Sequence, residues 1–319
     1  MNTNNSTVSQ PADTPPPLEK WSNLHAPDMT AMSREANSPT SIRGLLAELA
    51  KNRTALLGGA FLFFVFIVAA AAPVLFPGDP LEMVARPFLW PGQNVTYPLG
   101  TDAMGRDVLA GIVHGARVSL SIGFLAAGIG TVVGIVVGST AGYFGSYIDE
   151  ILLFIIEIFQ SIPGFILVVI IVAIAGSSAG VVACSISIVT WPTIARLVRS
   201  EFRSTREKDY VAAARSLGYG HARIIAREIL PNALPPVIVT STVMIATAVL
   251  MEAGLSFMGL TDPNIVSWGS MIGTGREVIR TAWYLTALPG FALVFTILSL
   301  NLVGDGLNDV LNPRLSEDR

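Results

Sequence analysis

Asp209-Tyr-Val-Ala-Ala-Ala-Arg-Ser-Leu-Gly218, which runs on to Glu228-Ile-Leu-Pro-Asn232, is a charged, alanine-rich segment in an otherwise very apolar chain. The basic residues in and just before it are Arg196, Arg199, Arg203, Arg206, Lys208, Arg215, Arg223 and Arg227. Each would cost about 2.5–3.5 kcal/mol at the centre of a bilayer. The segment must therefore lie outside lipid, and its positive charge places it on the cytoplasmic side.

The composition around this segment is that of an integral membrane protein. Of the 319 residues, 51% are hydrophobic and only 13% are charged, whereas a soluble domain carries roughly 25% charged residues. The net charge of -3 gives no indication of a nucleic-acid partner. Cys184 is the one cysteine, which excludes an internal disulfide and makes a metal site improbable.

Six apolar stretches are long enough to cross a bilayer, which requires about 20 residues. They are Ala55–Phe76, Val118–Tyr143, Ile151–Ala175, Ala179–Leu197, Leu234–Leu260 and Trp283–Val303. We therefore expect an all-α membrane fold with six transmembrane helices. With the charged loop in the cytoplasm, both termini also lie there.

The residues before the first span divide into two parts. Residues 1–40 are rich in Asn, Ser, Thr and Pro, which predicts a disordered cytoplasmic tail. Residues 41–53 place Ile42, Leu45, Leu46 and Leu49 on one helical face, which predicts an amphipathic helix at the membrane interface. The six-helix domain then occupies residues 54–319.

The second span carries a regular glycine pattern. Gly130, Gly134, Gly138 and Gly142 recur at every fourth residue and share one helix face. Such a face lets another helix approach closely. It predicts either a subunit interface or tight packing within the subunit, and the second is the commoner outcome.

The cytoplasmic loop, residues 200–232, has its own pattern. The residues at helical spacing on one side are Tyr210, Val211, Ala214 and Leu217. We expect Gly218 and Gly220 to end this helix, and a second helix at about Ala222–Ile229 to be limited by Pro231. The two helices would form a compact knob, the alternative being a solvated basic loop.

This loop resembles the coupling loop of ABC importer permeases, in which Glu-Ala-Ala, Gly and Leu-Pro recur. The matching residues are Ala213, Ala214, Gly218, Leu230 and Pro231. Asp209-Tyr210-Val211 and Asn232 are similar to the dipeptide/oligopeptide/nickel branch of that family. The chain departs from the pattern at Ala212, where the family usually has glutamate, and at Glu228, where this branch often has histidine.

Further motifs extend the resemblance over most of the chain. They are Pro98–Leu109 and Gly115–Leu120, which resemble the C-type subunit, then Leu255–Leu260, Ser267-Trp-Gly269, Gly304–Asp309 and Asn312-Pro-Arg314. They occur in the expected order relative to the spans. The resemblance implies a type I ABC importer permease fold in a bacterial or archaeal cytoplasmic membrane.

The resemblance also implies partners. The chain would pair with a B-type permease subunit, two ABC ATPase subunits and an extracytoplasmic substrate-binding protein, within the lipid bilayer. The chain has no phosphate-binding loop with Lys-Ser/Thr, so we expect no cofactor and no enzymatic activity here, with ATP and Mg bound by the ATPases. The ATPase-coupling residues would be Asp209, Tyr210, Ala213, Ala214, Arg215, Gly218, Gly220, Arg223, Leu230 and Pro231.

Polar residues within the spans are candidates for the transport path. Buried ionisable groups in a membrane usually face the bundle interior, a partner or water. We expect Glu157, Gln160 and Ser161 to border the translocation path, with Pro163 allowing the helix to bend, and include Glu252 as a further candidate. The alternative is hydrogen bonding between helices without contact to substrate.

In the loop before the second span, Asp107 is expected to pair with Arg106 or Arg117 and to fix the entry to that span, a metal site being the alternative. Two alternative classes of function make different predictions. A stand-alone secondary transporter or channel would work without ATPases, and a membrane-embedded hydrolase would need a motif that the sequence lacks. The sequence does not decide whether the substrate is a peptide, glutathione, a nickel chelate, an opine or an oligosaccharide.

Overall fold

The computed structural model describes residues 52–311, all within one compact unit. These residues form helices joined by loops and contain no β-strand apart from an isolated bridge between Thr101 and Asp107. The predicted tail and almost all of the predicted interfacial helix lie outside the described residues.

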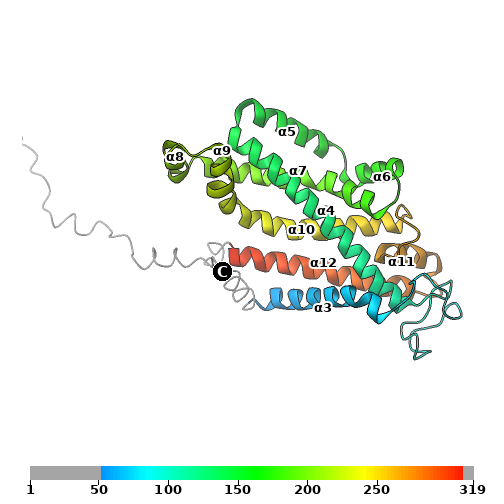
Figure 1. The fold of residues 1–319 in the computed structure, drawn as a ribbon. Helices are drawn as coiled ribbons and strands as arrows, with labels where there is room; N and C mark the ends of the chain where they lie inside the picture. The colour runs from blue at the N-terminus through cyan, green and yellow to red at the C-terminus, as the bar shows by residue number, and fades with distance from the viewer. Residues whose placement is uncertain (1–51, 312–319) are drawn as a thin grey trace, which may run out of the picture. The chain divides into compact units, whose positions relative to one another are not determined.

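Five single helices are long and apolar enough to cross a membrane, and one bent helix pair meets the same criterion when its two halves are taken together. The five are α3 (Arg53–Leu75), α4 (Val108–Phe144), α7 (Ala179–Arg206), α10 (Leu230–Phe257, continuous with the helical turns from His221) and α12 (Tyr284–Leu311). In Figure 1, α4 runs diagonally across α7 and α10, both of which it contacts, and α3 lies beside α12. The all-α membrane fold is thus confirmed.

The third predicted span, Ile151–Ala175, is wrong as a single helix. It consists of α5 (Ser146–Ser161) and α6 (Gly164–Ala175), bent by 84°. The break lies at Pro163, which has no backbone N–H to continue the helix and restricts the residue before it to extended conformations. Ile162 accordingly has φ -97° and ψ 131°.

Two helices are longer than the apolar stretches that predicted them. Helix α4 begins at Val108, ten residues before the predicted Val118, because Asp107 caps its first turn by accepting a hydrogen bond from the backbone N of Leu109 at 2.9 Å. Helix α7 continues past Leu197 to Arg206. An apolar stretch marks only the part of a helix that lies in lipid, and the helix itself can continue beyond the bilayer.

The predicted loop between the last two spans also contains helical structure. Helix α11 (Trp268–Gly275) is followed by the 3₁₀ turn η3 (Arg276–Val278). Ser267 and Ser270 form a reciprocal capping box at the start of α11. Helix α10 ends at Phe257, and Gly259 then adopts a φ of +75°, which favours glycine.

The glycine face of α4 packs against α7 within the same subunit. A Cβ atom built on Gly134 would lie 2.6 Å from Cβ of Ile194, and one on Gly138 would lie 2.4 Å from the carbonyl oxygen of Ala195. Only glycine permits this approach of the two backbones. Packing within the subunit is therefore the correct interpretation of the pattern, and the subunit interface is wrong.

The loop before α4 is held by backbone contacts rather than by an ion pair. At Gly100, with a φ of +80°, a Cβ atom would overlap the carbonyl oxygen of Leu89. Tyr284 donates its hydroxyl hydrogen toward the carbonyls of Leu89 and Thr101, at 2.9 and 3.0 Å. The predicted pairing of Asp107 with an arginine is wrong: in the described part of the chain the ion pairs join Asp149 to Arg199 and Arg203.

Candidate coupling site and transport helix

The charged loop folds into a small knob, residues 207–229, at one end of the bundle (Figure 1). It contains α8 (Asp209–Ser216), the single turn α9 (His221–Arg223) and the π-helical turn η2 (Ile224–Ile229). Gly218 makes the turn between them with a φ of +77°, which L-residues with side chains rarely adopt. The predicted pair of helices around a glycine turn is confirmed.

The second helix does not end at Pro231, contrary to the prediction. It passes through η2 directly into α10, and Pro231 is the second residue of α10. In the π-helical turn the backbone N–H of Leu230 bonds to the carbonyl of Ile225, so the hydrogen-bond pattern shifts by one residue just before Pro231. The knob is therefore built onto a membrane-crossing helix without an intervening loop.

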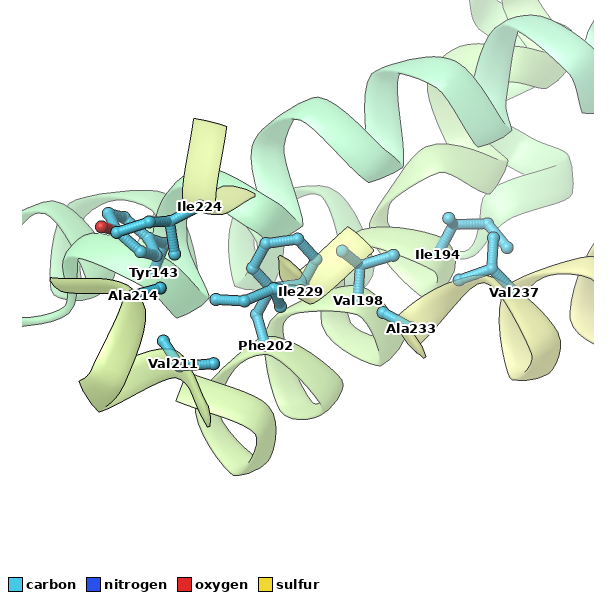
Figure 2. Close-up of a cluster of buried hydrophobic side chains, with 10 residues drawn as sticks. All are labelled: Tyr143, Ile194, Val198, Phe202, Val211, Ala214, Ile224, Ile229, Ala233 and Val237. Atoms are coloured by element: carbon cyan, nitrogen blue, oxygen red, sulfur yellow. The ribbon is translucent and has the colours of Figure 1, made fainter. Parts of the chain in front are cut away.

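A single hydrophobic cluster joins the knob to three membrane helices (Figure 2). The knob contributes Val211, Ala214, Ile224 and Ile229. The membrane helices contribute Tyr143 from α4, Ile194, Val198 and Phe202 from α7, and Ala233 and Val237 from α10. Because close-packed interiors transmit strain, displacement of the knob is passed to the ends of all three helices.

Tyr143 is the polar centre of this contact. Its hydroxyl lies 2.7 Å from Nδ1 of His221 in the knob. The guanidinium of Arg215 lies 5.5 Å from the centre of the Tyr143 ring, within the range of a cation–π interaction. Arg206 of α7 donates to the Tyr143 carbonyl at 3.1 Å. The end of α4 is thus bonded to both the knob and α7.

Helix α5 is tied to the same region by a charge pair. Arg199 of α7 binds both carboxylate oxygens of Asp149, with Nη2 at 2.7 Å from Oδ2, and Arg203 lies 3.9 Å from Oδ2. Asp149 is in the first turn of α5. A bidentate arginine–carboxylate pair fixes orientation as well as distance, so α5 follows the end of α7.

The knob presents most of the predicted coupling residues to solvent. Those exposed on the knob are Asp209, Tyr210, Ala213, Arg215, Gly218, Gly220 and Arg223, and Pro231 is exposed in the first turn of α10. Ala214 is buried in the cluster and Leu230 is half-buried, so these two support the knob from inside. Leu217 is 72% exposed, and it joins the outer surface although the sequence pattern places it with the buried residues.

Tyr210 is held in place although it is partly exposed. Its hydroxyl accepts a hydrogen bond from Nδ2 of Asn232 at 3.1 Å and donates toward the carbonyl of Glu228 at 3.4 Å. Burial raises the pKa of the Tyr210 hydroxyl, and the nearby Glu228 carboxylate raises it further. The hydroxyl therefore stays protonated at neutral pH and keeps its ability to donate.

Helix α5 has three distinct faces. Asp149 and Ile156 lie on the side toward α4 and α7, and Ile156 is completely buried. A second stripe at helical spacing, here called the polar stripe, carries Tyr147, Glu150, Glu157 and Ser161 with Phe154 among them, all exposed in this chain. Next to it runs an exposed apolar stripe, formed by Ile148, Ile151, Ile155, Ile158 and Ile162.

The polar stripe brings together part of the predicted path. Glu157 and Ser161 share it, and Gln160 lies at its edge, with Pro163 at the bend that follows. Carboxylates on a membrane helix avoid lipid and face water or a protein partner. That these residues border the path stays a prediction.

Glu252 lies in a different environment. It has no exposed surface, and it accepts hydrogen bonds from the hydroxyls of Ser119 at 2.9 Å and Ser256 at 2.6 Å. The cavity beside it measures about 10 Å³, room for roughly one water molecule. In this arrangement Glu252 joins α4 to α10, and its place on the path stays a prediction.

Sequence spacing gave no indication of the Tyr143–His221 and Asp149–Arg199 contacts. They join residues 78 and 50 positions apart, respectively. Tyr143 looks like the last residue of a span, and His221 like one more polar residue of a basic loop. The signal that could have found them is the position of all four at the same predicted cytoplasmic boundary.

Comparisons with known proteins agree with this architecture. The family model described as the binding-protein-dependent transport system inner membrane component matches residues 130–317. In solved structures, the chain is similar to an inward-facing form of the MetNI methionine ABC transporter, with a TM-score of 0.52, 22% identity, and coverage of 63% of this chain and 96% of that one. At this identity the likeness supports the fold alone.

Curated relatives match nearly the whole length. A di/tripeptide transport system permease protein of Pseudomonas aeruginosa is 35% identical over 283 residues, covering 87% of this chain and 93% of that relative. A probable peptide ABC transporter permease protein of Sinorhizobium fredii is 39% identical over 290 residues, covering 90% and 98%. The chain therefore belongs to the family of binding-protein-dependent transport system inner membrane components, the permease subunits of ABC importers.

Proposed function

We propose that this chain is one of two permease subunits of a bacterial ATP-driven importer for di- or oligopeptides. The observation that carries the proposal is the knob, whose outer face is free while its inner face is packed against α4, α7 and α10. The names of the relatives support peptides as the substrate class. In this proposal, an extracytoplasmic binding protein delivers the peptide and a B-type subunit completes the path.

Two ATPase subunits would receive the two knobs and would bind ATP and Mg. When the ATPases close on ATP, each draws its knob with it. The hydrophobic cluster and the Tyr143–His221 contact pass this movement to α4 and α7. The Asp149–Arg199 pair passes it to α5. The helices then expose the central path to the other side, which is alternating access between two global states.

The path itself would run along the polar stripe of α5. Replacing Glu157 with Gln keeps the shape and the hydrogen-bonding capacity of the side chain but removes its charge. We expect slower uptake by complexes that assemble normally, and unchanged uptake would remove Glu157 from the path. Glu150→Gln on the same stripe tests whether the effect depends on depth along α5.

Crosslinking tests the coupling directly. The exposed Cys184 is first replaced with serine, and a cysteine is then placed at Gly220, where an added Cβ meets no atom within 4 Å, or at Ala222. We expect disulfide or bis-maleimide crosslinks to a cysteine in the ATPase groove, with a yield that changes between apo and ATP-bound states. A cysteine at exposed Val95, in the loop at the opposite end of the bundle, is the negative control.

Uptake by proteoliposomes tests the transport activity. The four-subunit complex with its binding protein should accumulate labelled dipeptide only when ATP is inside with the ATPases. Uptake by the permease subunits alone would support the stand-alone transporter instead. Uptake of another solute class, with peptide rejected, would leave the importer assignment intact and overturn the peptide assignment.

A further inference from the structure

A groove lies between α3 and α4 on the outer surface of the helix bundle. It has a volume of about 270 Å³. Its lining residues are Phe66, Ala69, Ala70, Arg117, Leu120, Ser121 and Phe124. None of the contacts described above for the knob or for α5 involves these residues.

The groove is lined by small side chains in one part and by large aromatic side chains in another. Ala69 and Ala70 leave space on α3, while Phe66 and Phe124 meet edge to face with ring centres 5.2 Å apart. The groove is preformed, because Nε2 of His114 lies 3.1 Å from the carbonyl of Phe76 and joins the end of α3 to α4. An apolar groove that is lined by two small alanine side chains and flanked by a packed pair of aromatic rings fits an unbranched hydrocarbon chain.

Arg117 adds a cation to this apolar lining. It is exposed and takes part in none of the ion pairs or hydrogen bonds found within residues 52–311. A charged side chain at a lipid-facing surface is costly unless it reaches water or an anion. A phosphate group suits a guanidinium well, because the two form parallel hydrogen bonds.

The depth of the groove fits a lipid headgroup. Ala70 lies five residues before Leu75, the last residue of α3, which is about 8 Å along the helix axis. The groove is thus in the half of the bilayer that lies opposite the knob. From this depth a long arginine side chain extends toward the headgroup layer while its stem stays on the apolar surface.

We propose that this groove binds an anionic phospholipid of the outer leaflet, with one acyl chain over Ala69 and Ala70, beside the Phe66–Phe124 pair, and the headgroup phosphate on Arg117. The proposal rests on the membrane fold and its orientation, and it is independent of the substrate. The bound lipid would hold α3 against α4, so that the composition of the membrane contributes to the stability of this pair.

Native mass spectrometry of the purified complex tests the proposal, with phosphatidylglycerol and phosphatidylcholine as probes. We expect the wild type to retain phosphatidylglycerol. Arg117→Leu should bind it at least about tenfold more weakly, the loss expected for a hydrogen bond to a charged group, and Arg117→Lys should recover part of the binding. Ala70→Phe fills the groove without touching the charge and should also displace the lipid.

Ala60→Phe is the matched control, since Ala60 is exposed on α3 but does not line the groove. It should retain lipid like the wild type. Equal phosphatidylglycerol retention by all variants would overturn the proposal. So would loss of the B-type subunit from the Ala70→Phe complex, because a protein would then be the occupant. Loss of dipeptide uptake with lipid binding intact bears on the proposed function alone.

Discussion

Single glycines decide how closely α4 and α7 approach. At Gly134 an added Cβ would lie 2.6 Å from Cβ of Ile194 and 2.9 Å from the carbonyl of Trp191. Real Cβ atoms do not come so near, so one helix must move. Gly128, on the same helix, meets no atom within 4 Å. Both glycines lie inside α4, but only Gly134 is packed against α7.

We therefore expect Gly134→Ala and Gly128→Ala to have opposite effects on stability. Alanine gains helix propensity of up to about 1 kcal/mol over glycine at either site. At Gly134 the overlap costs about 1–3 kcal/mol and outweighs that gain. Thermal unfolding in detergent should give a lower Tm for Gly134→Ala and an equal or higher Tm for Gly128→Ala. Equal behaviour of the two variants would contradict the close packing of α4 on α7.

Tyr143 permits a test of coupling at the scale of one hydrogen bond. Tyr143→Phe keeps the ring in the cluster and removes the bond to His221, which contributes about 0.5–1.5 kcal/mol. We expect more ATP hydrolysed per peptide transported, with assembly unchanged. A double-mutant cycle with His221→Ala should show that the two effects are not additive. Additive effects would show that the two side chains act separately.

The elements differ in how far the sequence predicts them. Apolar stretches of about 20 residues locate the crossings because lipid excludes charge over that length. Hydrophobicity does not predict the part of a helix that lies outside lipid. The prediction therefore missed the first ten residues of α4, before Val118. The π-helical turn before Leu230 is equally hidden, because it depends on how Ile224 and Ile229 pack on α7 and not on local propensity.

Most of the candidate site was predictable from its resemblance to a known loop, except where tertiary contacts decide. The turn at Gly218 follows from the conformational freedom of glycine alone. Ala214 points inward because it packs in one cluster with Phe202 of α7, and this contact is not encoded within the loop itself. Leu217 lies outside that cluster and is exposed. The bend at Pro163 is visible as a proline in the sequence, but the sequence does not give its angle of 84°.

The bend between α5 and α6 gives a prediction for a whole element. Pro163→Ala restores a backbone donor and relieves Ile162, so we expect the two helices to become more nearly continuous. Spin labels at Ile151 and Ile174, both exposed, should then move apart, and transport should slow. Pro73→Ala in α3 is the control, because Pro73 already lies within an uninterrupted helix. Unchanged label distances would show that neighbouring helices, rather than the proline, hold the bend.

At the scale of the whole molecule, force must enter through a small exposed surface and leave through the bundle. Helix α8 exposes Tyr210 and Ala213, and Leu217 directly after it is also exposed, while Val211 and Ala214 are buried against the membrane helices. The inner side of the knob shares one hydrophobic cluster with the membrane helices. The strength of the proposed coupling therefore depends on the outer face, which would contact the ATPase. On that face the chain has an exposed alanine, Ala212, where the coupling loop that this segment resembles usually has glutamate.

Ala212→Glu should therefore strengthen the contact with the ATPase. The side chain is exposed, so the effect on folding should stay within about 0.5 kcal/mol. The added carboxylate gives the ATPase groove a charged group to bond, and we expect tighter subunit association and a higher rate of peptide-stimulated ATP hydrolysis. Ser204→Glu adds the same charge on α7 outside the knob and controls for net charge. If both variants strengthen association equally, the gain comes from long-range attraction, and Ala212 does not lie at the contact.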